Sequence, residues 1–299
     1  MRRRFVTLDV FTARRFAGNP LAVVLDCEGL DQATMQTIAR EFNFPETVFV
    51  LTAPLPVSRA EIRIFTPASE LAFAGHPTVG TAVLLGRGEA GGGPRDIVLA
   101  EGIGPVRCKV EPLGRDHGRA QFEVPRLPAD AGAVPDRTTI ATALHLDESD
   151  IGFDRFEPNR WSAGTAFVFV PVRGIDAIRR CRPDSARFDA AFGQSGPGLA
   201  YVFCRETVDP RHAFHARMFA PSLGIPEDPA TGSAAAAFAG IVARHGGLAD
   251  GNHRFIIEQG YEMGRPSVIR LAIVMAAQKL ASASIGGEAV VVTEGTIEA

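Results

Sequence analysis

The sequence has few cysteines, and none of them are paired by spacing. Four occur in 299 residues: Cys27, Cys108, Cys181 and Cys204. No two lie close enough to form a CxxC pair, so zinc-knuckle and redox motifs that depend on this spacing are absent. We therefore expect four reduced structural thiols, as is usual for a protein of a reducing compartment.

An excess of basic charge and long apolar runs are also lacking. Lysine and arginine total 31 against 34 acidic residues, so the net charge of −3 gives no argument for nucleic-acid binding. No stretch approaches the about 18 apolar residues of a membrane span. The start MRRRFVTLDV has three arginines but no long apolar run behind them. We therefore expect a cytoplasmic location, with neither a signal peptide nor a membrane partner.

Several sequence motifs of cofactor-binding proteins and hydrolases are absent or occur in the wrong structural context. The run Gly86–Gly91 satisfies GxGxxG, but it follows a predicted helix instead of a strand, so a dinucleotide site is rejected. Neither a Walker lysine motif nor a GxSxG nucleophile elbow is present. His212 and His215 lie in HAFH, where no carboxylate arrangement compels a metal site. We therefore expect neither a metal nor a cofactor.

What is present is the pattern of a globular protein of mixed secondary structure. Hydrophobic residues make up 46% and charged residues 22%, enough for an ample core in one large or two ordinary domains. Alternating or continuous apolar runs predict strands at 5–10, 21–25, 46–50, 60–65, 97–100, 106–110, 121–124, 165–170, 199–204, 214–219, 255–258, 268–274 and 287–292. Helices are predicted at 32–43, 78–85, 138–146, 175–180 and 233–245.

The chain also resembles itself at a spacing of about half its length. RIFTP at 63–67 matches RMFAP at 217–221, an offset of 217 − 63 = 154. Gly75, which opens one small-residue helix, matches Gly232, which opens another, at an offset of 232 − 75 = 157. Two copies of one unit are expected, joined by the Pro- and Ala-rich segment 125–135. A ligand site is expected in the cleft between them.

The first copy carries a candidate anion site at the turn before its small-residue helix. His76 stands between Gly75 and Pro77, directly before the predicted helix start at Thr78. Glycine lets backbone N–H groups approach a ligand, and a helix N-terminus offers unpaired donors with partial positive charge. The turn could thus hold an anion beside a titratable imidazole. The plainer alternative is a histidine with a structural role.

The second copy carries the matching turn EDPATGS, and the first copy also carries a candidate acid–base carboxylate. Asp228, Thr231 and Ser233 could cap the following helix or contact a ligand. Glu46 follows Phe44-Pro45 at the start of an apolar strand, a position that suits acid–base chemistry. The alternative is that Glu46 is an exposed charge at the end of a strand.

Five motifs in register resemble one family. DVFTxxxFxGNPLAVV, FNFPETVFV, RIFTPxxELAFAGHPTVGTA, EDPATGSAA and EQGxxMGRPS look like the PhzF-like (phenazine biosynthesis) isomerase family, from about residue 8 to 294. The resemblance implies an α+β, diaminopimelate-epimerase-like fold. Its two pseudo-symmetric lobes each wrap a mixed, mostly antiparallel sheet around a central helix. We expect an N-terminal lobe at 1–128, to which a last strand at about 288–299 returns, and a C-terminal lobe at 129–287.

The resemblance also implies the chemistry and its residues. Epimerases of the wider superfamily carry acid–base cysteines at places that fall here on Ala74 and Thr231, which excludes a two-cysteine mechanism. The family uses a glutamate instead, which maps to Glu46. The catalytic set would be Glu46, His76 and Asp228. The substrate-binding set would be Asn19, Gly75, Thr231, Gly232 and Ser233.

The implied reaction is a cofactor-independent isomerisation of a small cyclic amino or hydroxy carboxylate resembling trans-2,3-dihydro-3-hydroxyanthranilate. A proton moves between ring carbons, and the family is typically a homodimer. Two other functions stay open: a non-catalytic protein that holds a small carboxylate between two helix ends, and a hydrolase with Ser233 as nucleophile. The missing nucleophile elbow disfavours the hydrolase.

Overall fold

A computed structural model describes residues 1–53, 57–87, 93–194 and 196–299. The chain forms two compact units: unit 1 is Met1–Glu123 with Gly286–Ala299, and unit 2 is Val124–Ile285. In the part of the chain that is described, no helix is long and apolar enough to cross a membrane. Residues 88–91 of the rejected GxGxxG run lie outside the described residues.

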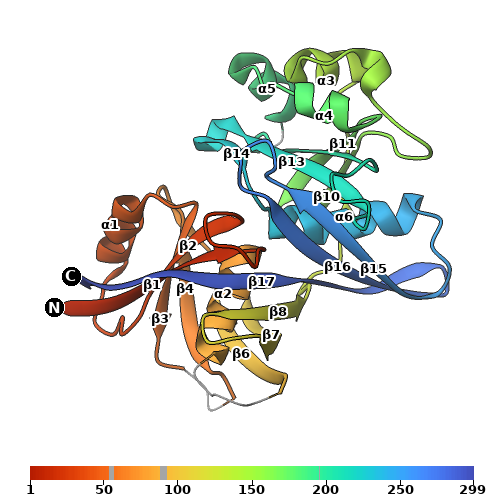
Figure 1. Cartoon of the computed structure of the whole chain (residues 1–299). Coiled ribbons are helices and arrows are strands. Elements are labelled where there is room, and N and C mark those ends of the chain that lie inside the picture. Colours follow the sequence, from red (N-terminus) through yellow and green to blue (C-terminus); the bar gives the residue numbers. More distant parts are fainter. Residues whose placement is uncertain (54–56, 88–92, 195) are drawn as a thin grey trace. The chain divides into compact units, whose positions relative to one another are not determined.

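In the residues that are described, unit 1 consists mainly of strands and contains two helices (Figure 1). Its elements are β1 (Arg2–Val10), β2 (Asn19–Val24), α1 (Gln32–Phe42), β3 (Glu46–Leu51), β4 (Ala60–Phe65), β5 (Glu70–Leu71), α2 (Gly75–Gly86), β6 (Arg95–Glu101), β7 (Gly104–Pro112), β8 (His117–Glu123) and the second part of β17 (Lys279–Glu298).

The sheet of unit 1 is mixed and closes on itself. The pairs β1–β2, β3–β4, β6–β7 and β7–β8 are antiparallel, whereas β2–β3 and β4–β6 are parallel. β17 pairs with both β1 and β8, which joins the two ends of the strand series. Closure of this kind leaves few unpaired edges.

Helix α2 lies against the inner side of these strands. It contacts β1, β2, β3, β6, β7 and β8, and nearly all of its residues are buried. Its sequence GHPTVGTAVLLG is small and apolar on every side, as a helix surrounded by other elements requires. Gly80 is needed here because a Cβ would stand 2.6 Å from Leu21 Cδ2 and 2.8 Å from Val10 Cγ2. The helix begins at Gly75, three residues before the predicted start.

Unit 2 contains the remaining elements. They are β9 (Ala129–Asp130), α3 (Arg137–Leu144), η1 (Glu148–Asp150), β10 (Asn159–Ser162), β11 (Ala166–Pro171), α4 (Ile175–Arg180), α5 (Ser185–Phe192), β12 (Ala200–Cys204), β13 (Phe214–Ala220), η2 (Pro221–Leu223), β14 (Ile225–Asp228), α6 (Gly232–His245), β15 (Gly251–Gln259), β16 (Ser267–Ala276) and the first part of β17.

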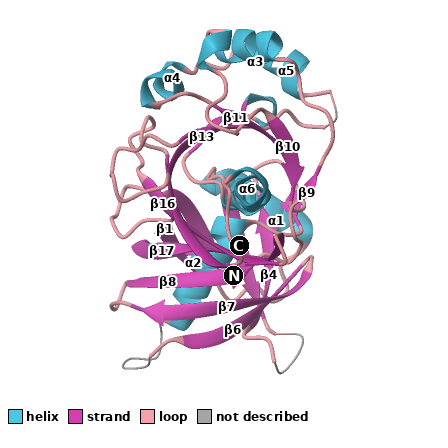
Figure 2. Cartoon of the chain, turned by 90° about the vertical axis from the view of Figure 1, so that its right-hand side faces the viewer, coloured by secondary structure: helices cyan, strands magenta, loops and turns pink. Residues whose placement is uncertain are grey.

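The strands of unit 2 also form a mixed sheet, with helices on both faces. β11–β12 and β13–β15 are parallel, and β10–β11, β12–β13, β13–β14 and β15–β16 are antiparallel. One face carries Val168, Val170 and Val202, which pack against α3, α4 and α5. Figure 2 looks along α6 and shows β10, β11 and β16 around it, on the other face. Phe238 of α6 stacks there on Phe169, with ring centroids 5.8 Å apart.

Among the elements that differ from the sequence predictions, two have a clear physical reason. The last strand, predicted at 287–292, is the 20-residue β17, whose alternation was obscured by small residues and by Gly286-Gly287. A Cβ at Gly286 would lie 2.6 Å from the Ala120 carbonyl oxygen, so the glycine is required by a close backbone approach. Helix α5 was not predicted. Asp184 caps it by accepting from Arg187 N, and Phe188 and Phe192 supply its buried face.

Candidate active site

The first candidate turn is the N-terminus of α2. Ala74 is the N-cap residue and makes no side-chain capping bond, and Thr78 N donates to the Ala74 carbonyl at 3.2 Å as the first intrahelical bond. The first turn is therefore Gly75-His76-Pro77. Pro77 has no N–H, which leaves the N–H groups of Gly75 and His76 as donors at the positive end of the helix. Such a helix start can hold a carboxylate.

The structure brings His76 and Glu46 together at this turn. Their side chains are 5% and 16% exposed, and His76 Nε2 lies 3.3 Å from Glu46 Oε2. Burial lowers the pKa of His76 to about 3, against the opposing effect of a hydrogen bond to the Pro20 backbone. Pro20 has no N–H, so the neutral imidazole donates to its carbonyl. Nε2 is the ring nitrogen that lies 3.3 Å from Glu46 Oε2, and it makes no hydrogen bond to the residues that the structure describes.

The strand that carries Pro20 also carries Asn19. Asn19 is fully buried at the start of β2, and Leu21 pairs with Glu46 at the start of β3. The turn before it depends on Gly18, whose φ is +64° and whose Cβ would stand 2.3 Å from the Val10 carbonyl oxygen. The GNP turn thus places Asn19 at the start of β2, two residues before the residue that pairs with Glu46.

The second candidate turn, in unit 2, is held by its own polar contacts. Thr231 is the N-cap residue of α6 but makes no side-chain capping bond. Its hydroxyl instead donates to Asp228 Oδ2 at 2.5 Å. Gly232 is buried and Ser233 half-buried in the first turn of α6. Asp228, Thr231, Gly232 and Ser233 are therefore one constellation, as Asn19, Glu46, Gly75 and His76 are another in unit 1.

Ala74 and Thr231 occupy the same structural position. Each is the N-cap residue, in extended conformation, of the long apolar helix of its unit. The described cysteines lie elsewhere: all four are free and buried, and burial raises the pKa of each thiol. Neither helix start therefore carries a thiolate.

Comparison with known proteins decides the family. The model of the family described as "Phenazine biosynthesis-like protein" matches residues 8–295. The chain belongs to this family. An uncharacterized isomerase of Mesorhizobium japonicum is 49% identical over 302 residues, which cover 99% of this chain and 98% of that protein. The trans-2,3-dihydro-3-hydroxyanthranilate isomerase of Pseudomonas fluorescens is 33% identical over 294 residues, which cover 98% of each.

A solved structure agrees with the family assignment. The crystal structure of a phenazine biosynthesis protein of the PhzF family from Bacillus anthracis has a TM-score of 0.89 at 26% identity and covers 100% of both chains. The resemblance seen in the sequence motifs is thus confirmed, and the fold is PhzF-like and epimerase-like, with a mixed sheet and few helices.

The sequence interpretation missed Gln259, a fully buried residue at the end of β15. Its Nε2 donates to the Asp228 carbonyl at 2.7 Å and approaches Thr231 Oγ1 at 3.0 Å, and its Oε1 accepts from Thr231 N at 3.2 Å. Gln259 therefore fixes the EDPATGS turn. The signal was the EQGxxMGRPS family motif, which quotes this residue without showing its contact.

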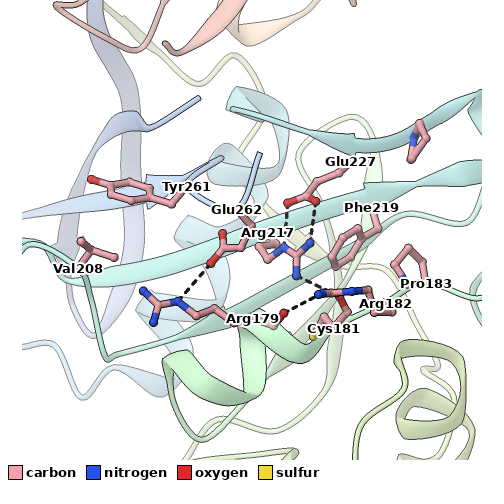
Figure 3. A pocket seen from close by; sticks show the side chains of 11 residues that line it. Arg179, Cys181, Arg182, Pro183, Val208, Arg217, Phe219, Glu227, Tyr261 and Glu262 are labelled. Atoms are coloured by element: carbon pink, nitrogen blue, oxygen red, sulfur yellow. Dashed lines mark hydrogen bonds and ion pairs between the residues drawn. The ribbon is translucent and has the colours of Figure 1, made fainter. Parts of the chain in front are cut away.

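A repeated arginine–glutamate pair lies beside each turn. In unit 2, Nε and Nη2 of Arg217 bind the two carboxylate oxygens of Glu227 at 2.8 and 2.7 Å (Figure 3). In unit 1, Arg63 binds Glu70 in the same way at 2.7 and 2.7 Å. The two pairs line cavities of about 570 and 600 Å³, respectively. No predicted site residue lines either cavity.

A buried chain of histidines and glutamates was also missed in unit 2. Glu258 accepts from His212 Nδ1 and His215 Nδ1, both at 2.7 Å, and His215 Nε2 lies 3.0 Å from Glu262 Oε1. These carboxylates come from β15 and the turn after it, so the HAFH segment itself does not indicate the contacts. Among the residues described, no group of three or more side chains is arranged to hold a metal ion.

These buried contacts between histidines and glutamates should make the free energy of unfolding depend on pH. Burial opposes the charge of His215, but hydrogen bonds and charge attraction from Glu258 and Glu262 outweigh it and raise its pKa. The pKa values of both glutamates are lowered, because their hydrogen bonds to histidine outweigh burial. Stability from the histidine is present below its unfolded pKa of about 6.5 and is lost as pH rises through the raised value. Stability from the glutamates is lost at acid pH.

His215→Gln is therefore expected to cost about 1–3 kcal/mol of unfolding free energy at pH 6 and clearly less at pH 9. Urea unfolding at both values measures it, with His253→Gln, a histidine outside this chain of contacts, as the control. A cost that is the same at pH 6 and pH 9 would contradict a charged His215.

Proposed function

We propose that the chain is a cofactor-independent isomerase that moves a carbon-bound proton in a small cyclic amino or hydroxy carboxylate, with Glu46 as the acid–base residue. One observation carries the proposal: Glu46 Oε2 lies 3.3 Å from Nε2 of a buried, neutral His76 at the anion-holding end of α2. The relative named trans-2,3-dihydro-3-hydroxyanthranilate isomerase supports the reaction and substrate class.

The proposed division of labour follows the chemistry of each group. The N–H groups of Gly75, His76, Gly232 and Ser233 bind the substrate carboxylate and stabilise charge that develops on it. Asn19 and Thr231 belong to the same binding set. Asp228 and His76 orient the amino and hydroxyl groups. We further propose that the chain has two lobes, one wrapped around α2 and the other around α6, and that it forms a homodimer.

The proton balance is simple in this scheme. The Glu46 carboxylate takes a proton from a ring carbon and becomes a carboxylic acid, while the electron pair of the broken C–H bond enters the ring. Because His76 Nε2 carries a lone pair, it can accept a hydrogen bond from the newly protonated Glu46. Glu46 then returns the proton to another ring carbon, and the enol that leaves tautomerises to the ketone.

Turnover in heavy water tests the function. The protein is mixed with trans-2,3-dihydro-3-hydroxyanthranilate and followed by proton NMR and mass spectrometry. We expect consumption of the substrate, with solvent deuterium at ring carbon. The alternative, a protein that only binds small carboxylates, predicts thermal stabilisation by such compounds without consumption or exchange. That outcome across a panel of cyclic amino and hydroxy carboxylates would overturn the proposal.

A further inference from the structure

The turn between β6 and β7 is docked against the residues that lead into α2. Glu101 ends β6 and is 8% exposed. Ile103 N donates to the Ala72 carbonyl at 3.2 Å. A Cβ at Gly102 would stand 2.8 Å from Ala72 Cα, so the backbones are in close contact. Glu101 therefore stands next to the segment that leads into α2.

The link between Glu101 and α2 is the hydroxyl of Thr78, which is itself fully buried. Thr78 Oγ1 lies 2.8 Å from the Ala74 carbonyl oxygen and 2.8 Å from Glu101 Oε1. A hydroxyl has one hydrogen to donate, and a carbonyl oxygen can only accept. If Thr78 donates to Ala74, the remaining contact is a hydrogen bond only when Glu101 is the donor, as a neutral carboxylic acid.

The surroundings of the carboxyl group favour this neutral form. Glu101 Oε2 is buried and makes no hydrogen bond to the described residues. A buried carboxylate without partners on one oxygen is costly, whereas the carbonyl oxygen of a neutral acid is much less so. The series Glu101 to Thr78 to Ala74 then runs in one direction and ends on the N-cap residue of α2.

We propose that Glu101 is a positioning residue for the proposed site: as a neutral acid it donates to Thr78 and so fixes the helix turn that offers the Gly75 and His76 N–H groups to the substrate carboxylate. This inference rests on the proposed function only for the identity of the ligand whose carboxylate is bound. When Glu101 ionises, Thr78 turns its hydrogen to Glu101, and a negative charge stands behind the turn that should attract an anion.

The ionisation falls in an accessible range. Burial raises the pKa of Glu101 to about 8, opposed by the bond to Thr78. Cys108 on β7 is close to Glu101, and burial and this carboxylate raise the pKa of its thiol. Glu61, Arg63 and Glu70 line the same cavity as Glu101. Carboxylate binding should therefore weaken above pH 8, with KM rising and kcat changing little.

Binding of 3-hydroxyanthranilate, a stable aromatic carboxylate, tests this without relying on turnover. From pH 7 to pH 9 its Kd should rise about tenfold in the wild type, because one pH unit above the pKa leaves about a tenth of Glu101 neutral. Glu101→Gln, whose amide still donates to Thr78, should change less than twofold over the same range. Glu101→Leu should bind weakly at both pH values, and the recovery in Glu101→Gln distinguishes the hydrogen bond from packing.

Cys108→Ser is the matched control and should keep the wild-type loss of binding at pH 9. A loss that persists in Glu101→Gln would overturn the proposal, as would its disappearance in Cys108→Ser. If Glu101→Gln fails to fold, the carboxyl carbon of labelled glutamate, followed by NMR in the wild type, must titrate near pH 8. Absent turnover with intact pH-dependent binding would refute the isomerase and leave Glu101 in its role.

Discussion

Glu46→Gln is expected to lower kcat for the proposed isomerisation by about 10²–10⁴-fold, the range usual for loss of a general acid–base group. The amide cannot take a proton from carbon, so both consumption and deuterium incorporation should fall together. It can still donate a hydrogen bond to His76 Nε2, 3.3 Å from the present Oε2. The fold and the binding of 3-hydroxyanthranilate should therefore change little.

The informative comparison is between chemistry and binding in the same variant. Single-turnover rates in heavy water measure the first, and a titration with 3-hydroxyanthranilate measures the second. Glu41→Gln, an exposed glutamate on α1 five residues earlier, controls for the loss of one negative charge. Exchange that survives in Glu46→Gln at the wild-type rate would remove Glu46 from the reaction, whatever the fate of the isomerase assignment.

Much of the fold could be predicted because its signals are local. Asp31 predicts the start of α1, and its side chain accepts from Thr34 N. Gly246-Gly247 predicts the end of α6, and Gly247 has a φ of +65°. β17 could not be bounded in the same way. Its length depends on pairing with β1 and β8, which lie more than 150 residues away, and not on its own side chains.

The candidate site likewise has parts that local motifs predict and parts that depend on contacts between distant residues. Motifs placed Glu46 and His76 on neighbouring elements of one unit, and Asp228 and Thr231 in one turn of the other. The supporting contacts could not be predicted, because each joins side chains distant in sequence. Gln259 reaches Asp228 across 31 residues and Glu101 reaches Thr78 across 23. Single carboxylates and amides carry no local signal of such pairing, and only the packed structure supplies it.

The repeat-related arginines provide the second large effect, on stability. Arg217→Ala is expected to cost about 3–5 kcal/mol, because it leaves Glu227 as an unpaired charge whose side chain is 14% exposed. It also removes the donor for the Ile178 and Cys181 carbonyls, each bound by Nη1 at 3.0 Å at the end of α4, and the contact of the guanidinium with the Phe219 ring at 4.8 Å.

Arg63→Ala is the matched control within the same chain. The Arg63–Glu70 pair has the same two-bond geometry and a similar stacking on Phe65, but its side chains are 26% and 30% exposed. Water can replace the lost partner there, so the cost should be about 1 kcal/mol. Urea unfolding followed by circular dichroism measures both. Arg217 additionally binds the Ile178 and Cys181 carbonyls, so we expect its larger cost to come from burial and from these two bonds together. Equal costs for the two variants would refute both contributions.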